Sequence, residues 1–328
     1  MSNPTSSSLG WRRLLSTPTP VLFLASIAIA IVLVGRSGAW TSIGEAVRQL
    51  SWQTVALALV LYGAGLLLLS FRWHALARMA GATAAPQSST EVFLTSVMVN
   101  YAAPIGLAVP MRTALTTRDL GLPVGTAAGV TLWEALLDLA TLAAIGTLWI
   151  AVAGLDAARL LITNGGTWLK VLGVVALVVL VLVLALSLLV RRVRRRVGEF
   201  LAAAVSMARR NPRWWCAAAA ITIIFWAIQL LVLRLLLVGF GQPPPSLEAL
   251  FGLTGWPVLI GMISPVPGGA GVREALMVAV ASATRLDTAV VLLTAVAYRM
   301  ALFVMLPILY AGARWWGASN RSRAAAHG

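Results

Sequence analysis

Six charged residues lie within otherwise apolar segments and are the best candidates for chemistry in this chain. They are Arg112, Glu134, Asp138, Arg273, Glu274 and Arg299. An ionised side chain at the centre of a lipid bilayer costs roughly 2.5–3.5 kcal/mol on insertion scales, so such residues are usually functional. Arginine forks bind phosphate oxygens through two parallel hydrogen bonds. The set therefore indicates an anion-binding site or a group of buried ion pairs.

The two carboxylates Glu134 and Asp138 are spaced i,i+4, which places them on one face of a helix. Two carboxylates in a medium of low dielectric repel each other unless cations lie nearby. We expect Arg112 and Arg273 to be those cations, with Arg299 across the interface. Three interpretations fit: structural ion pairs, an anionic head group bound by the arginines, or proton coupling through either acid.

Proline and glycine interrupt two apolar stretches, residues 91–120 and 247–285. The first interruption contains Asn100, Pro104 and Gly106, and the second contains Pro265, Pro267, Gly268, Gly269 and Gly271. In both stretches a proline lies the same distance before an arginine that opens an Arg-x-Ala-Leu sequence, which predicts an internal repeat. The glycine-rich segment is typical of a tight turn. It is equally typical of a loop that directs the amides of the next helix toward an anion.

The composition of the chain predicts the kind of structure that holds these residues in place. Of 328 residues, 60% are hydrophobic and 11% are charged, whereas a soluble domain carries about 25% charged residues. The chain is therefore predicted to be an all-α integral membrane protein. Runs of about 20 apolar residues span a bilayer. About six spans are expected, at residues 20–35, 52–71, 125–153, 167–190, 214–239 and 287–313.

The net charge of +15 comes mainly from arginines between the apolar runs. The positive-inside rule then predicts a multi-pass protein of the cytoplasmic membrane with both termini inside. On this topology the stretch 91–120 is re-entrant from the cytoplasm and 247–285 from the outside. Two opposed re-entrant hairpins indicate an inverted repeat, with halves at about 52–153 and 214–313, within one membrane domain, 19–316. Residues 1–18 and 317–328 are expected to be cytoplasmic tails.

Other basic segments have simpler interpretations. The sequence Phe-Arg-Trp-His at residues 71–74 is typical of an interfacial anchor, because tryptophan and arginine favour that depth. The arginine run at residues 191–196 is a positive-inside signal that also attracts anionic lipid.

Several activities are not expected. One cysteine, Cys216, excludes an intramolecular disulfide, and the two histidines make a zinc site improbable. No cofactor is expected, and no nucleotide-binding or Ser/His/Asp pattern indicates an enzyme. Nucleic acid is not an expected partner, since the positive charges do not belong to a folded basic face.

The motifs together resemble the flippase-like membrane region of lysylphosphatidylglycerol synthases. The resemblance rests on Asn100, Pro104, Gly106, Arg112, Arg118, Asp119, Leu120, Gly121, Glu134 and Asp138, and on Pro265, Pro267, Gly268, Gly269, Gly271, Arg273 and Glu274. It extends from about Arg12 to Trp316. It implies a stand-alone member without the aminoacyl-transferase domain. Pro110 departs from the family pattern, which has glycine shortly before the arginine.

This resemblance implies a flippase or scramblase that moves an anionic or phosphate-bearing lipid, or a lipid-linked glycan, between leaflets. Membrane lipids would then be its partners. A second hypothesis is a non-transporting accessory subunit that anchors a lipid-modifying or glycosyl-transfer enzyme, with the arginine run as its docking surface. The weakest is a membrane enzyme with Glu134 and Asp138 as acid and base.

Overall fold

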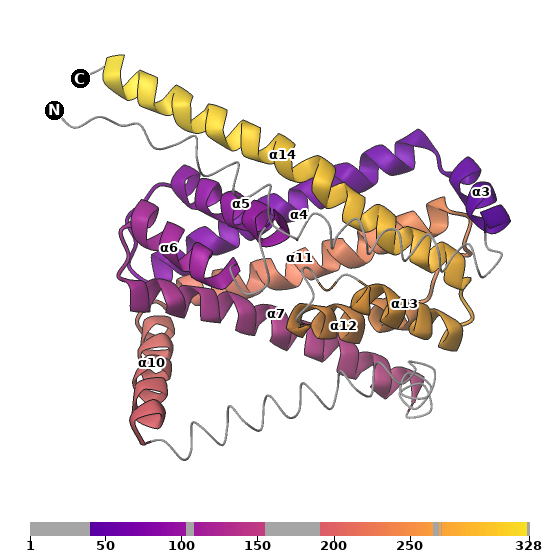
Figure 1. Ribbon diagram of the computed structural model, residues 1–328, viewed down its shortest axis with the longest axis horizontal. Coiled ribbons are helices and arrows are strands. Elements are labelled where there is room, and N and C mark those ends of the chain that lie inside the picture. Colours follow the sequence, from indigo (N-terminus) through magenta and orange to yellow (C-terminus); the bar gives the residue numbers. More distant parts are fainter. Residues whose placement is uncertain (1–39, 103–107, 155–190, 265–268, 270, 327–328) are drawn as a thin grey trace.

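The computed structural model describes residues 40–102, 108–154, 191–264, 269 and 271–326 (Figure 1). These residues form ten helices and no strand, which confirms the all-α prediction. Some predicted features lie outside the described residues. They are the spans 20–35 and 167–190 and the residues Pro104, Gly106, Pro265, Pro267 and Gly268.

Four long helices form the body of the protein. They are α4 (Trp52–Met79), α7 (Val124–Ala153), α11 (Pro212–Gly239) and α14 (Thr288–Ala326). Each contains an apolar segment long enough to cross a membrane. At about 1.5 Å per residue they exceed the roughly 30 Å hydrocarbon core. These helices correspond to four of the six predicted spans, although α4 continues beyond the predicted end at Phe71.

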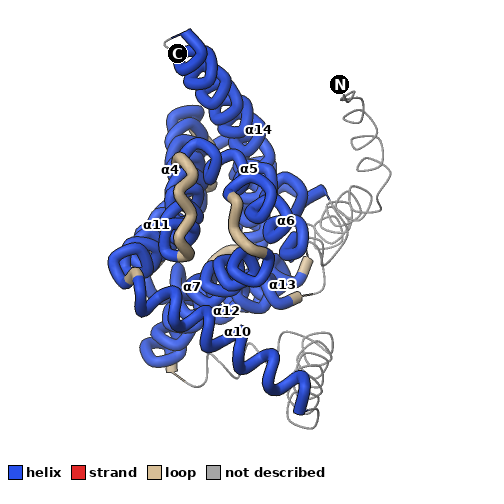
Figure 2. Tube along the Cα trace, turned by 90° about the vertical axis from the view of Figure 1, so that its left-hand side faces the viewer, coloured by secondary structure: helices blue, strands red, loops and turns tan. Residues whose placement is uncertain are grey.

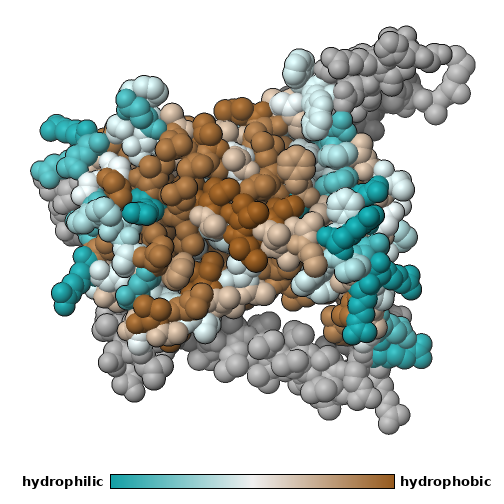
Figure 3. Space-filling model, turned by 180° about the vertical axis from the view of Figure 1, so that it is seen from behind, coloured by the Kyte–Doolittle hydropathy of each residue, from teal (hydrophilic) through white to brown (hydrophobic). Residues whose placement is uncertain are grey.

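The surface of the bundle has the polarity expected in a lipid environment. Figure 3 shows an apolar band across the middle of the molecule and hydrophilic side chains toward both ends. Large apolar side chains on the long helices are exposed, among them Val60, Ile223 and Ile308. A contiguous apolar surface of this kind is unfavourable in water and favourable in lipid. The chain is therefore a multi-pass membrane protein.

Each interrupted stretch forms a pair of short helices that pack side by side. The first pair is α5 (Pro86–Ala102) and α6 (Ala108–Leu120), and the second is α12 (Leu247–Ile263) and α13 (Val272–Ala283). The longest has 17 residues, or about 25 Å, which is shorter than the hydrocarbon core. Proline and glycine therefore break each stretch into a helical hairpin, here called the first and second hairpin.

The two hairpins enter the bundle from opposite ends (Figure 1). The helices α4 and α11 pack side by side and are antiparallel, because the Asn211 side-chain amide at the start of α11 donates to the backbone carbonyl of Met79 at the end of α4 (2.9 Å). The second hairpin begins and ends at the other end, where the Asp287 amide lies 3.5 Å from Gln242 Oε1. This is the arrangement expected of an inverted repeat.

Two further helices lie outside the four long helices and the hairpins. Helix α3 (Trp40–Gln49) lies between the predicted span 20–35 and α4. Helix α10 (Arg191–Arg210) crosses the direction of the long helices, as Figures 1 and 2 show. The Trp133 indole of α7 donates to the carbonyl of Ala204 in α10 (2.9 Å), which fixes α10 against the bundle.

Helices α12 and α7 approach each other closely where Gly255 lies against Gly146. A Cβ atom added at Gly255 would overlap the backbone nitrogen and Cα of Gly146, and backbone atoms cannot move aside as a side chain can. We expect Gly255→Ala to destabilise the protein by about 1–3 kcal/mol, the usual cost of overpacking. Thermal unfolding of the detergent-purified protein measures this loss.

The matched control is Gly312→Ala in α14, where an added Cβ meets no atom within 4 Å. Alanine in a helix interior stabilises by roughly 0.5–1 kcal/mol relative to glycine, so this variant should unfold at or above the parent's temperature. Equal unfolding temperatures for Gly255→Ala and the parent would contradict the prediction, since they would mean that α7 and α12 accommodate the added methyl group without loss of stability.

Candidate functional site

Two groups of charged side chains lie inside the bundle, one in each half. The first cluster consists of Arg72 from α4, Arg112 from α6, and Glu134 and Asp138 from α7. The second cluster consists of Arg273 and Glu274 from α13 and Arg299 from α14. The sequence predicted every member except Arg72.

Arg72 lies at the centre of the first cluster. Its Nη1 and Nη2 atoms donate to Oδ1 and Oδ2 of Asp138 at 2.6 and 2.8 Å, a bidentate arrangement. Nη2 also donates to Glu134 Oε1 at 3.1 Å. The residue is only 1% exposed. One guanidinium therefore bridges the two carboxylates of α7 and removes the repulsion between them.

Arg112 neutralises the remaining oxygen of the pair. Its Nη1 donates to Glu134 Oε2, and its Nε donates to the Ser96 hydroxyl of α5 at 2.9 Å. The guanidinium also lies 5.3 Å from the Trp73 ring and 5.4 Å from the Phe93 ring, within cation–π range. The prediction that Arg112 is a partner of these acids is confirmed.

Helix α11 completes the first cluster with neutral donors and acceptors. The Trp226 indole donates to Asp138 Oδ1 at 3.1 Å, and the Thr222 hydroxyl accepts from Arg72 Nη1 at 3.3 Å. Two guanidinium groups and two carboxylates leave no net charge. The geometry is that of a closed buried ion-pair network, which tolerates the loss of any one partner poorly.

The interpretation of residues 71–74 as an interfacial anchor is wrong. Arg72 and Trp73 are both almost fully buried, and α4 runs on to Met79. The reason is electrostatic, since the acids of α7 require a cation at their own depth and Arg72 supplies it. The apolar sequence Ala75-Leu76-Ala77, which continues beyond Arg72, is the signal that the span does not end there.

In the second cluster Glu274 has two partners. Its Oε1 accepts from Arg299 Nη2 at 2.7 Å, and its Oε2 accepts from the backbone amide of Gly271 at 2.7 Å. Gly271 has a φ of +82°, a conformation that favours glycine, and it precedes the first residue of α13. The Glu274 carboxylate thus takes the amide that the sequence predicted to face an external anion.

Arg273 has no carboxylate partner among the described residues. Its guanidinium lies 4.6 Å from the centre of the Tyr298 ring, and its buried Nε has no hydrogen-bond partner there. The prediction that Arg273 neutralises Glu134 or Asp138 is therefore wrong, because Arg72 already occupies that place. Arg299, also expected near those acids, pairs with Glu274 instead. Among the described residues, two guanidinium groups and one carboxylate give this cluster one excess positive charge.

The family described as the lysylphosphatidylglycerol synthase transmembrane region matches residues 23–309. The chain belongs to this family. Comparison with curated proteins gives no significant match. The residues that match this lysylphosphatidylglycerol synthase transmembrane region include both hairpins and both charged clusters.

Within this transmembrane domain, one face of α11 connects the two clusters. Thr222, Trp226 and Gln229 are spaced i, i+4, i+7 and are all buried. Gln229 Oε1 accepts from the Tyr298 hydroxyl at 2.5 Å, and the Tyr298 ring packs edge-on against Tyr62 of α4. A row of polar side chains therefore runs through the interior from Arg72 to Arg273.

The predicted repeat pairs Asp138 with Arg299, two residues of opposite charge. Arg299 follows Arg273 by the same number of residues as Asp138 follows Arg112. The equivalent helices α7 and α14 thus present an acid in the first cluster and a base in the second.

The structure describes only some of the predicted loop residues. Asn100 lies in the last turn of α5. Gly269 is buried at φ +65°, and a Cβ there would lie 2.6 Å from the carbonyl oxygen of Gly261, so only glycine fits. Among the described residues no group of three histidine, cysteine or acidic side chains could hold a metal ion.

Proposed function

We propose that this protein moves an anionic or phosphate-bearing lipid between the leaflets of the membrane, and that the second cluster binds the head group. The observation that carries the proposal is Arg273, an inward-lying guanidinium with no carboxylate partner among the described residues. An isolated charge at low dielectric is costly, so the site gains free energy when an anion enters.

Phosphate suits the chemistry of the second cluster. A guanidinium binds two phosphate oxygens at once, and Arg273 has donors available to do so. Arg299 is held by Glu274 and adds positive potential beside it. The single negative charge of a phosphodiester would balance the excess positive charge of the cluster. The acyl chains would remain in the bilayer while the head group crosses.

The arrangement of the two hairpins favours a transport path for the head group that can open to either leaflet. Short helices that enter a bundle from opposite ends and break in its middle are characteristic of inverted-repeat transporters, whose sites lie at the repeat interface. Non-helical backbone at membrane depth is tolerated where it is buried or lines a wet cavity. The breaks after α5 and α12 would be re-entrant loops of this kind.

The first cluster has a structural role in this proposal. Arg72, Arg112, Glu134 and Asp138 satisfy one another and carry no excess charge. Both acids are occupied by guanidinium groups, which favours scaffolding over acid–base catalysis. Transport without chemical change of the lipid is therefore the activity we propose.

Lipid movement in reconstituted vesicles tests the function. Fluorescent phosphatidylglycerol in the inner leaflet should become accessible to an external quencher faster in vesicles with the protein than in protein-free vesicles. A neutral, zwitterionic fluorescent phosphatidylcholine should move more slowly, because its head group has no net negative charge. Equal rates with and without protein would contradict the proposal and favour an accessory subunit, which should then co-purify with one stoichiometric partner.

The topology of this proposal has its own test. In this proposal both termini and the start of the first hairpin lie on the cytoplasmic side of the cytoplasmic membrane, as the positive-inside rule predicts from the arginine-rich loops. In a Cys216→Ser background, Ala85→Cys should resist an impermeant thiol reagent added to intact cells, and Pro244→Cys should react. Both positions are exposed. Reaction of both from the same side would contradict opposite entry of the hairpins.

A further inference from the structure

Helix α10 has two chemically distinct faces. It carries seven arginines and a single acid, Glu199. Ala204 is buried against α7, where Trp133 contacts its carbonyl, and Met207 lies against Gly129. Arg195, on the opposite face, has a side chain that is 82% exposed. The helix is thus amphipathic, and the side chain of Arg195 is directed away from the bundle.

Part of the apolar face of α10 is exposed. Val197, Leu201 and Val205 are spaced i, i+4, i+8 and form one line along the helix, with 42%, 46% and 42% of their surfaces exposed. An exposed apolar line beside an arginine face is the pattern of helices that lie in a membrane interface.

The position of α10 agrees with this pattern. It lies across the long helices at the end of the bundle where α4 ends and α11 begins, and it extends beyond the bundle (Figures 1 and 2). Its C-terminal end leads through Asn211 into the transmembrane helix α11. A helix that meets the end of a span and runs across its direction lies along the membrane surface.

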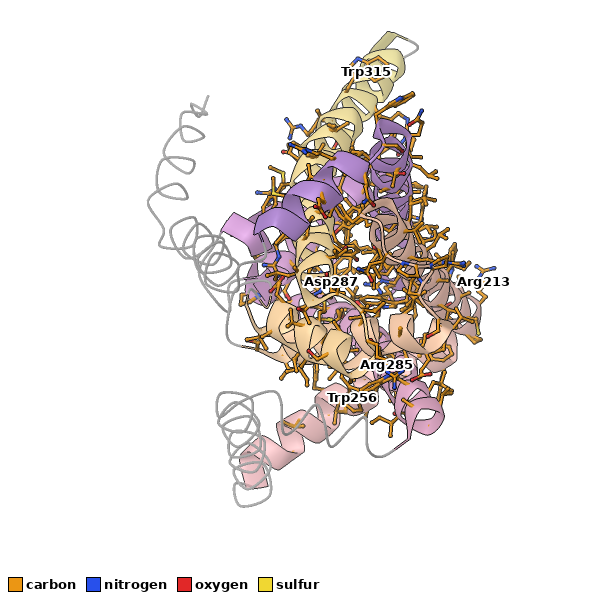
Figure 4. The ribbon with its side chains drawn as sticks, turned by 90° about the vertical axis from the view of Figure 1, so that its right-hand side faces the viewer. Arg213, Trp256, Arg285, Asp287 and Trp315 are labelled. Carbon is orange, nitrogen blue, oxygen red and sulfur yellow. The ribbon has the colours of Figure 1, made fainter. Side chains whose placement is uncertain are left out.

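Further positive charge surrounds the end of α10 that joins α11. Arg209 and Arg210 end the helix and are exposed. The guanidinium groups of Arg78 and Arg213 lie 5.6 and 5.5 Å from the Trp214 ring. Figure 4 shows Arg213 at the outer edge of the bundle. Arginines and a tryptophan at one level match the depth of phospholipid head groups.

We infer that α10 is an interfacial helix that binds the surface of an anionic leaflet. Val197, Leu201 and Val205 enter the boundary of the acyl chains, and the arginines contact lipid phosphates. We favour lipid as the partner of Val197, Leu201 and Val205 because an anionic leaflet offers acyl chains to these apolar residues and negative head groups to the adjacent arginines. The inference does not depend on lipid translocation.

Spin labels on the full-length protein in vesicles test the inference. In a Cys216→Ser background, labels are attached at Leu201→Cys on the exposed apolar line and at Ala203→Cys on the polar face, which is the matched control. The vesicles contain phosphatidylcholine and phosphatidylglycerol. The label at residue 201 should collide with oxygen and be shielded several-fold from a water-soluble nickel chelate. The label at residue 203 should show the reverse.

Two outcomes would overturn the inference. Shielding of residue 201 from both oxygen and nickel would mean that protein covers the helix, and free access of nickel would mean that water does. The anionic requirement has a separate test. The triple variant Arg195→Gln, Arg209→Gln, Arg210→Gln should raise nickel access at residue 201, and Arg234→Gln, an exposed arginine of α11, should leave it unchanged. Unchanged access in the triple variant would overturn the role of the arginines.

Discussion

Replacement of Arg72 with methionine is expected to destabilise the protein by about 3–5 kcal/mol, the largest effect of any single substitution considered. The variant leaves Asp138 buried without its bidentate partner and removes one of the two cations that Glu134 contacts. Each uncompensated carboxylate retains its desolvation cost and loses the attraction that offsets it. The temperature of unfolding in detergent, followed by size-exclusion chromatography, measures the effect.

A double variant separates lost charge pairing from lost packing. Arg72→Met with Asp138→Leu removes one cation and one anion together, and it leaves Glu134 paired with Arg112. Replacing a buried ion pair with apolar residues is often neutral, so the double variant should be more stable than Arg72→Met alone. Arg234→Met at an exposed position is the control and should unfold with the parent. An Arg72→Met variant as stable as the parent would show that the first cluster contributes nothing to folding.

Replacement of Arg273 with glutamine is expected to reduce lipid translocation roughly 10–100-fold while the unfolding temperature stays close to that of the parent. Arg273 has no ion pair among the described residues, so no buried carboxylate loses its partner when the charge is removed. The lost interaction is a charge-assisted hydrogen bond to the head group, worth about 1.5–3 kcal/mol. Translocation of labelled phosphatidylglycerol and thermal unfolding are measured on the same preparation.

Two comparisons make this result specific. Arg273→Lys keeps the charge and loses the fork, so it should recover part of the rate. Arg112→Gln should lose stability because it breaks the pair with Glu134, whereas Arg273→Gln should lose only transport. Translocation at the parental rate by a folded Arg273→Gln variant would contradict the head-group role. A fall in both stability and rate would mean that Arg273 is a structural residue.

Much of the fold follows from the order of apolar, proline and glycine residues. The composition predicts a membrane protein, and the breaks in 91–120 and 247–285 correspond to the turns of two hairpins. The spacing of Glu134 and Asp138 places both acids on one helix face, and Arg112 pairs with one of them as expected. These features depend on helical periodicity and on the length of apolar runs, which are local properties.

The outer ends of the helices follow the same local rules. Figure 4 shows Trp315 toward the end of α14, away from the packed bundle, and its side chain is exposed. Tryptophan at the end of a span favours the membrane interface.

Partner choice among the buried charges was decided only by the tertiary structure. The sequence by itself determined the membrane class, the family resemblance, the two hairpins and six of the seven members of the two clusters. It did not determine that Arg72 lies between Glu134 and Asp138, or that Arg299 pairs with Glu274 and leaves Arg273 without a carboxylate. The physical reason is that an ion pair depends on distances of a few ångströms between separate helices. Those distances are set by how α4, α7, α11 and the hairpins pack together, which no single segment of the sequence specifies.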